Sequence, residues 1–161
     1  MEQQTAIEIV DYKPEYDKRF KEINEQWITR SFVMEEEDIK TLDHPYEYII
    51  KNGGKIYIAL YNGEVVGTCA YLNFGNNTYE MIKMAVDENY RGLKIGLNIG
   101  IESLQKMKAL GAKKIFLYSN TKGSGVAIQL YRKLGFTEIE LGQSEFQRAD
   151  IKMELHLLNT K

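Results

Sequence analysis

Short apolar runs separated by turn residues predict strands in the first half of the chain. A weak alternation of apolar and polar residues over Ile7–Val10 predicts the first strand. Three longer runs follow: Lys55–Tyr61, Glu64–Phe74 and Thr78–Val86. Asn62-Gly63, the strongest type of hairpin dipeptide, and then Gly75–Asn77 separate these runs. We therefore expect an antiparallel meander.

Apolar residues at helical spacing predict a helix that Pro14 opens, since proline is favoured at the first helical position. Its apolar positions are Tyr16, Phe20, Ile23 and Trp27. A short second helix is expected after Asp43-His44-Pro45, ending near Lys51. Asn52-Gly53-Gly54 supplies its left-handed cap. The acidic run Glu35–Asp38 lies between the two helices.

Helices and strands alternate in the second half of the chain. An amphipathic helix ends at Gly111, and its predicted buried stripe is Leu97, Ile101, Leu104 and either Met107 or Lys108. The apolar run Lys114–Ser119 then predicts a buried strand, so strand, helix and strand indicate a parallel pair joined by a crossover. The last expected elements are a helix from about Ser124 to Leu134 and a hairpin of Phe136–Leu141 with Arg148–Leu155, whose loop holds Gly142–Glu145.

Composition narrows the class of protein. The 161 residues predict a single domain, residues 1–161, and the net charge of −2 argues against nucleic acid as the main partner. Cys69 is the only cysteine and is expected to be a buried core residue. His44 and His156 have no further ligand at a metal-binding spacing, so no metal site is expected. Without a signal peptide or a membrane-length apolar run, we expect a cytoplasmic protein and no membrane partner.

The segment Met81–Gly100 carries the first candidate chemistry. A strand ends, a turn with Arg91, Gly92 and Lys94 follows, and a helix begins. The free N–H groups and partial positive charge of a helix start suit a phosphate or pyrophosphate, and the two basic residues add full charges. Many helix starts carry such residues without binding a ligand, so this motif alone is weak.

Two blocks of sequence resemble the GCN5-related N-acetyltransferase (GNAT) superfamily. Tyr79–Gly92 followed by Gly96 is similar to its acetyl-coenzyme A signature, Arg/Gln-x-x-Gly-x-Gly/Ala, in which Arg91 and Gly96 match the first and last positions. The second block, at the usual distance downstream, comprises Ser119-Asn120, Ala127, Leu130-Tyr131 and Lys133–Phe136. The resemblance covers about Lys55 to Leu141.

Lys94 departs from the family pattern, which has glycine there. Either the backbone at Lys94 does not need a positive φ, or its side chain reaches toward a phosphate. The chain is also similar to bacterial acetyltransferase domains that are sometimes fused to MarR-type regulators. Its own sequence carries no such regulator, so the acceptor is not identified.

The resemblance implies an α/β (α+β) fold: a mixed central sheet of about seven strands, antiparallel in its first half, with about four helices on its faces. It implies direct transfer of an acetyl group from acetyl-CoA to a primary amine in a ternary complex, without a metal. The sequence leaves the oligomeric state open, and a homodimer is one option, because the closing strands of this fold frequently form dimer contacts. The implied coenzyme contacts are Met84, Ala85, Val86, Arg91, Gly92, Leu93, Lys94, Ile95, Gly96, Asn120 and Ala127.

Two residues are candidates for proton transfer. Tyr131 occupies the position where many family members place a tyrosine beside the coenzyme sulfur, so it is the candidate acid; the alternative is a core tyrosine with a satisfied hydroxyl. Glu80 is the candidate base, directly or through water; the alternative is a solvent-facing charge. The family's strand splays after a bulge, which would free backbone groups near Met84–Val86 for the acetyl carbonyl. Asn120 could instead cap its loop.

The sequence does not decide which residues form the wall of the acceptor site, or which of the competing functions the protein has. Glu35–Asp38 either attracts a cationic amine or forms a solvated face. Candidate aromatic lining residues, any of which could instead be core, are Trp27, Phe32, Tyr46, Tyr71 and Phe74. A non-catalytic acyl-CoA-binding or sensing module is the alternative function. Nucleotide binding is poorly supported, because the spacing of Gly92, Gly96 and Gly100 fits no nucleotide motif.

Overall fold

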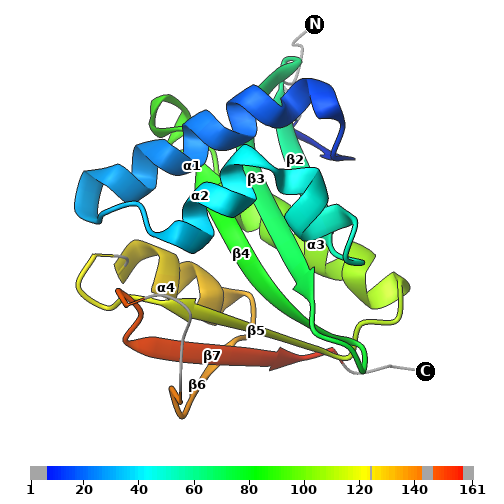
Figure 1. The fold of residues 1–161 in the computed structure, drawn as a ribbon, viewed down its shortest axis with the longest axis vertical. Helices are drawn as coiled ribbons and strands as arrows, with labels where there is room; N and C mark the ends of the chain where they lie inside the picture. Colours follow the sequence, from blue (N-terminus) through cyan, green and yellow to red (C-terminus); the bar gives the residue numbers. More distant parts are fainter. Residues whose placement is uncertain (1–6, 124, 143–146, 158–161) are drawn as a thin grey trace, which may run out of the picture.

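A mixed seven-stranded sheet forms the centre of the molecule (Figure 1). The computed structural model describes residues 7–123, 125–142 and 147–157. Its strands lie in the order β1-β2-β3-β4-β5-β7-β6, and every neighbouring pair is antiparallel except β4 with β5. The strands are β1 (Ile7–Asp11), β2 (Lys55–Tyr61), β3 (Glu64–Asn73), β4 (Thr78–Val86), β5 (Lys114–Ser119), β6 (Thr137–Ile139) and β7 (Ile151–His156). The expected meander, the crossover and the α/β class are confirmed.

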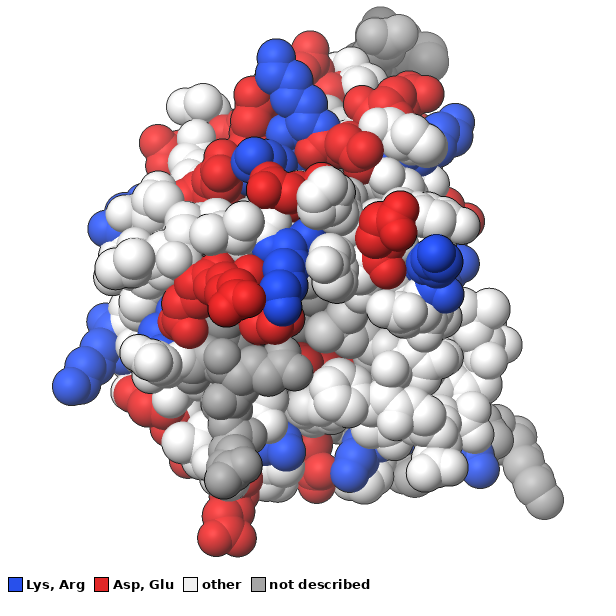
Figure 2. Space-filling view, viewed as in Figure 1, with Lys and Arg blue, Asp and Glu red and all other residues white. Residues whose placement is uncertain are grey.

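Helices cover both faces of the sheet. They are α1 (Asp17–Ser31), α2 (Glu36–Asp43), α3 (Ile95–Ala109) and α4 (Gly125–Lys133). The described residues also form three short helical turns. Two are 3₁₀ turns, η1 (Pro14–Tyr16) and η3 (Glu88–Tyr90), and the third is a π-helical turn, η2 (Tyr46–Ile50). One apolar cluster lies between the sheet and α1 and α2, and a second between the sheet and α3 and α4. Figure 2 shows basic and acidic side chains interspersed over the α1 and α2 side, and no wide basic surface forms on the described part of that face.

The acidic run does not lie between two helices as expected but begins one. Glu35 is the N-cap of α2, and its carboxylate and that of Asp38 form a reciprocal capping box with the backbone. Acidic residues in a first turn complement the helix dipole. The helix predicted to end near Lys51 is the π-helical turn η2.

The buried stripe of α3 also differs from the prediction. Leu104 and Met107 are buried as expected, but Ile101 is 43% exposed. Ile95 and Ile99 face the sheet instead, while Gly96 and Gly100 face α4. A Cβ at Gly100 would lie 2.6 Å from Leu134, so the missing side chain permits two helices to approach closely.

The closing hairpin is shorter than predicted. β6 and β7 pair antiparallel as expected, yet β7 lies between β5 and β6. Gln147–Asp150 precede β7 and are not strand. Gly142 is described, whereas Gln143–Glu145 of the predicted loop and Ser124 of the predicted helix start lie outside the described residues. None of the described helices combines the length and apolar character needed to cross a membrane.

A β-bulge near the end of β4 interrupts the pairing of this strand with β3. Ala70 of β3 pairs with Ile82, and Thr68 pairs with Ala85, so two residues of β4, Lys83 and Met84, oppose one residue of β3. Lys83 has φ +54°, in the left-handed region. On its other edge β4 pairs with β5 only over Thr78–Glu80. The backbone from Met81 onward therefore leaves β5, and this divergence opens the site.

Candidate functional site

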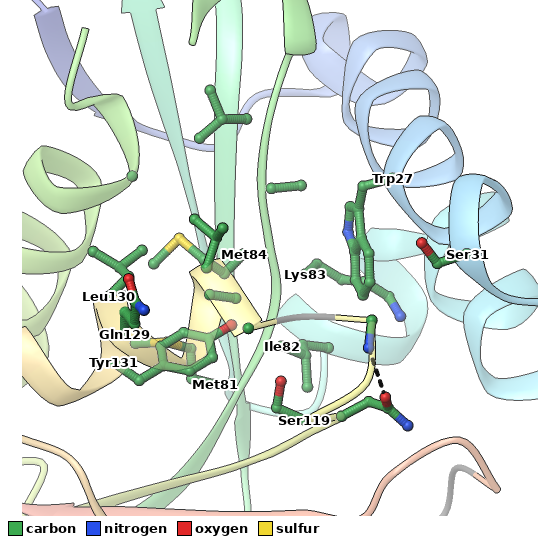
Figure 3. Close-up of a pocket in the computed structure, with 18 of the residues that line it drawn as sticks. Trp27, Ser31, Met81, Ile82, Lys83, Met84, Ser119, Gln129, Leu130 and Tyr131 are labelled. Carbon is green, nitrogen blue, oxygen red and sulfur yellow. Dashed lines mark hydrogen bonds between the residues drawn. The ribbon is translucent and has the colours of Figure 1, made fainter. Parts of the chain in front are cut away.

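A cavity of about 770 Å³ lies where β4 and β5 diverge. Figure 3 shows Trp27 and Ser31 of α1 on one side and Gln129, Leu130 and Tyr131 of α4 on the other. The last residues of β4 and the loop after β5 lie between them. From Met81 onward β5 does not pair with this edge of β4. The backbone groups of β4 there are therefore available to a molecule in the cavity.

Ten of the eleven predicted coenzyme contacts line this cavity. They are Met84, Ala85, Val86, Arg91, Gly92, Lys94, Ile95, Gly96, Asn120 and Ala127. Leu93 is the exception, and it is 39% exposed. Two chain segments far apart in the sequence, the turn before α3 and the loop after β5, are thus brought to one cavity.

The turn before α3 forms a basic cradle at the cavity's edge. Lys94 is the N-cap residue of α3 and has φ +59°. The suggestion that its backbone needs no positive φ is therefore wrong, and a lysine occupies the left-handed conformation usual for glycine. The first N–H groups of α3 have no intrahelical partner, and with Arg91 and Lys94 in the cavity lining they could hold an anion.

Tyr131 lies in the cavity wall on α4. Its ring packs edge-on against Phe136, with 6.0 Å between ring centroids, and its hydroxyl points into the cavity (Figure 3). No hydrogen bond joins this hydroxyl to any other described residue, so the alternative of a core tyrosine with a satisfied hydroxyl is not what the structure shows. Burial raises the pKa of Tyr131, and the phenol remains a neutral donor at pH 7.

Glu80 lies on β4 at its last paired position with β5, where the two strands separate. It pairs with Leu72 of β3 and Phe116 of β5, and it is only 2% exposed while lining the cavity. The alternative reading as a solvent-facing charge on a half-exposed strand is therefore wrong. Tyr131 and Glu80 line one cavity from different elements.

Sequence reasoning missed a buried group of charges beside Glu80. The Nζ of Lys83 lies 2.6 Å from Oδ1 of Asp38. Arg148, just before β7, donates to both Asp38 oxygens at 2.8 and 2.9 Å and to Glu35 at 3.2 Å. We call Glu35, Asp38, Lys83 and Arg148 the ion cluster; Lys83 and Arg148 also line the cavity. A lysine within the apolar run Met81–Met84 was the available sequence signal.

Opposing effects set the protonation of the ion cluster. Burial alone would raise the pKa of Asp38, but the hydrogen bonds from Arg148 and the charge of Lys83 lower it to about 2. Burial lowers the pKa of Lys83, and the nearby carboxylates of Asp38 and Glu80 oppose that effect. Asp38 is fully buried, so one end of the acidic run is neither solvated nor open to a ligand.

Hydrogen bonds fix the loop after β5. The Oδ1 of Asn120 accepts from the backbone N–H groups of Lys122 and Gly123 at 2.8 and 2.9 Å, and its Nδ2 donates to the Arg148 carbonyl. Asn120 therefore caps its loop while lining the cavity.

The candidate acceptor residues divide into three groups. Trp27 and Phe32 line the cavity. Tyr71 is a core residue whose hydroxyl is bonded to Ser103 at 2.7 Å. Tyr46 and Phe74 lie outside the cavity lining, each 53% exposed. Among the residues described, no group of histidine, cysteine and carboxylate side chains could hold a metal ion.

Comparison with solved structures shows the same fold in known acetyltransferases. A GNAT-family acetyltransferase of Staphylococcus aureus Mu50 is 24% identical, with 95% of this chain and 100% of that chain covered and a TM-score of 0.85. The PaiA N-acetyltransferase of Thermoplasma acidophilum, solved with coenzyme A, is 19% identical over 94% and 99%, with a TM-score of 0.74. YncA of Salmonella typhimurium, a putative acetyltransferase solved with acetyl-CoA, is 17% identical over 98% and 97%, with a TM-score of 0.75.

No curated protein sequence matches the chain. The family model described as the acetyltransferase (GNAT) family matches residues 17–136, which is well over half of the 161 residues. The protein therefore belongs to the acetyltransferase (GNAT) family.

Proposed function

We propose that the protein is an N-acetyltransferase that moves the acetyl group of acetyl-CoA directly to a primary amine in a ternary complex. The observation that carries this proposal is the convergence of Tyr131 and Glu80 on one cavity, between a free edge of β4 and a basic helix start. This arrangement provides an acid, a base, backbone donors and an anion site, the four features that acetyl transfer from a thioester uses.

Acetyl-CoA is the proposed co-substrate, and the cavity residues fit its parts. The pyrophosphate binds at the start of α3 beside Arg91 and Lys94. The pantetheine arm lies along the free edge of β4, where a backbone can pair with it, and Asn120 and Ala127 line its other side. The solved relatives from Thermoplasma acidophilum and Salmonella typhimurium, which hold coenzyme A and acetyl-CoA, support this assignment.

The chemistry requires that two protons leave the amine nitrogen and that one reaches the departing sulfur. A lysine-like amine has a pKa of ~10.4, so only about one molecule in a thousand is neutral at pH 7. Glu80 accepts the proton, directly or through water, and the amine nitrogen attacks the thioester carbonyl carbon. As the new C–N bond forms, the C–S bond breaks, and Tyr131 donates its proton to the departing sulfur. The nitrogen then gives up its second proton, which restores the Tyr131 phenol, and Glu80 releases its proton to solvent.

A sensing module that binds acyl-CoA without turnover is the alternative. The replacement of glycine by Lys94 is its main support, yet Lys94 keeps the left-handed backbone that the turn requires. Glu80 is only 2% exposed in the cavity wall, and this also favours an enzyme, since burying a carboxyl group is costly.

Thermal unfolding with different ligands tests the binding part of the proposal. Coenzyme A should raise the melting temperature, and by mass action a ligand at ~100 times its Kd stabilises by ~2.7 kcal/mol. ATP and NAD at the same concentration should raise it much less. Equal shifts with all three would indicate a general nucleotide site and would contradict the proposal.

A further inference from the structure

The bulge in β4 changes which way Lys83 points. Side chains alternate between the two faces along a strand, so Glu80 and Ile82 share a face and Lys83 would lie on the other. The extra residue and the φ of +54° place Lys83 on the same face as Ile82, where it reaches Asp38 of α2. Figure 3 shows its side chain extending from β4 to the α1 side of the cavity.

This placement is costly for the protein. A left-handed backbone conformation is unfavourable for a residue with a Cβ, and burying an ammonium group requires a partner. Asp38 supplies the partner at 2.6 Å, and the side chains of Lys83 and Asp38 are 4% and 0% exposed. Strained residues of this kind are concentrated at functional sites.

The distribution of buried charges around Lys83 connects it to Glu80. Within the ion cluster the two cations, Lys83 and Arg148, balance the two carboxylates of Glu35 and Asp38. Glu80 is a further buried charge that lines the same cavity and lies on the same face of β4 as Lys83, and its carboxylate opposes the lowering of the Lys83 pKa by burial. A Coulomb interaction is mutual, so Lys83 stabilises the carboxylate of Glu80 by the same energy. Among the described residues, Tyr118, Lys152 and Glu154 are further titratable or charged groups on this face by register and contact, and Arg30 of α1 lines the same cavity.

We propose that Lys83, held by Asp38, is a positioning residue that keeps the buried carboxyl group of Glu80 ionised and therefore able to accept the amine proton. Burial favours the neutral form of a carboxyl group, and an opposite charge close by favours the charged form. Lys83 acts through Glu80 and exchanges no proton with the substrate. This inference rests on the proposed function, in which Glu80 is the base.

Direct titration of Glu80 tests the inference without requiring activity. Carbon-13 NMR of the glutamate carboxyl groups, with Glu80→Gln used to assign the signal, gives the midpoint pH of Glu80 in each variant. Lys83→Met removes the charge, and Lys83→Gln removes it while keeping a donor for Asp38. Both should raise the midpoint by about one pH unit, because removing a nearby opposite charge favours the neutral form of a carboxyl group. Asp38 keeps its two hydrogen bonds from Arg148, which helps both variants to fold.

The pH dependence of kcat/KM provides the second readout. In Lys83→Met and Lys83→Gln the acidic limb should move to higher pH by the same amount, because the base must be unprotonated. Lys83→Arg should restore the wild-type limb. The control variant Lys21→Met removes a lysine from the exposed ion pair with Asp43 and should leave the acidic limb at its wild-type pH.

An unchanged Glu80 midpoint in both neutral variants would overturn the inference. The inference would also fail if the acidic limb of Lys83→Arg lay at the same pH as the limbs of Lys83→Met and Lys83→Gln, because the charge at this position would then not cause the shift. If no amine is acetylated, the proposed function fails, whereas the NMR midpoints still decide whether Lys83 acts on Glu80.

Discussion

The hydroxyl of Thr68 donates a 2.6 Å hydrogen bond to the backbone carbonyl of Lys83, the bulged residue of β4. The same hydroxyl accepts a hydrogen bond from Nδ2 of Asn24, on α1, at 3.0 Å. A side chain on β3 therefore provides the partner that the bulge removes from the strand ladder, and a helix side chain holds it in place. This chain of contacts fixes the segment that forms one wall of the cavity.

Replacing Thr68 by valine, which has nearly the same shape, should destabilise the protein by ~1–3 kcal/mol, because the buried carbonyl of Lys83 loses its partner. Urea unfolding measures this change. Thr68→Ser keeps the hydroxyl and is the matched control, with a smaller loss of stability. If valine and serine cost the same free energy, the hydroxyl does not support the bulge.

Asp38→Asn should destabilise the protein by ~3–5 kcal/mol at pH 7, since it leaves Lys83 as a buried charge without its carboxylate. Glu36→Gln, on the exposed side of the same helix, is the control and should change stability by under ~0.5 kcal/mol.

The effect of Asp38 also depends on pH with a definite sign. Its pKa falls from 3.8 to about 2 on folding, so its stabilising effect is complete above about pH 4 and is lost as the pH decreases toward 2. The difference in unfolding free energy between wild type and Asp38→Asn should therefore narrow across this window. A constant difference from pH 5 to pH 2 would contradict the role assigned to this carboxylate.

Substitutions at Lys94 separate the backbone of the turn from the charge of the side chain. Lys94→Gly relieves the left-handed strain and should raise stability by up to ~1 kcal/mol, whereas Lys94→Ala keeps the strain. Both should weaken coenzyme A binding several-fold and reduce its salt dependence, because both remove a cation from the phosphate end. Calorimetric titration measures the Kd, with Lys106→Ala on the exposed side of α3 as the control. Unchanged affinity in both variants would place the Lys94 side chain outside the coenzyme site.

Local patterns predicted most of the fold. The Asn-Gly turn, the apolar runs of β2 to β5 and the glycine that ends α3 depend on residues close in sequence, so their positions were confirmed. The face of α3 was harder to predict, because Leu97 and Ile101 fit a helical stripe as well as Ile95 and Ile99 do. Contact of Gly96 and Gly100 with α4 decides between the two, and that contact is tertiary.

The site likewise contains parts that local motifs predict and parts that depend on tertiary contacts. The turn at Arg91–Gly96 and the position of Tyr131 follow from short motifs, and both lie at the cavity. The ion cluster could not be read from the sequence, because Asp38 is 45 residues from Lys83 and 110 from Arg148. Its formation also requires the bulge, without which Lys83 would face away from α2.

Tyr131 should remain protonated throughout the practical assay range, because burial raises its pKa. The pH profile of kcat should therefore show no loss of rate from Tyr131 ionisation up to about pH 10, the pKa of an exposed tyrosine. A basic limb below that pH that is present in the wild type and absent from Tyr131→Phe would contradict this expectation.

The measurement that tests the account most directly is thiol release from acetyl-CoA against a panel of small-molecule and peptide amines, for wild type, Tyr131→Phe and Glu80→Gln. We predict turnover with at least one amine, and a fall in kcat of at least ~10-fold in each variant. The Tyr131 hydroxyl has no bonded partner among the described residues, so Tyr131→Phe should keep coenzyme A affinity and melting temperature. Full activity in both variants would contradict the assigned roles. Tight coenzyme A binding without turnover on any amine would contradict the central claim and favour the sensing module.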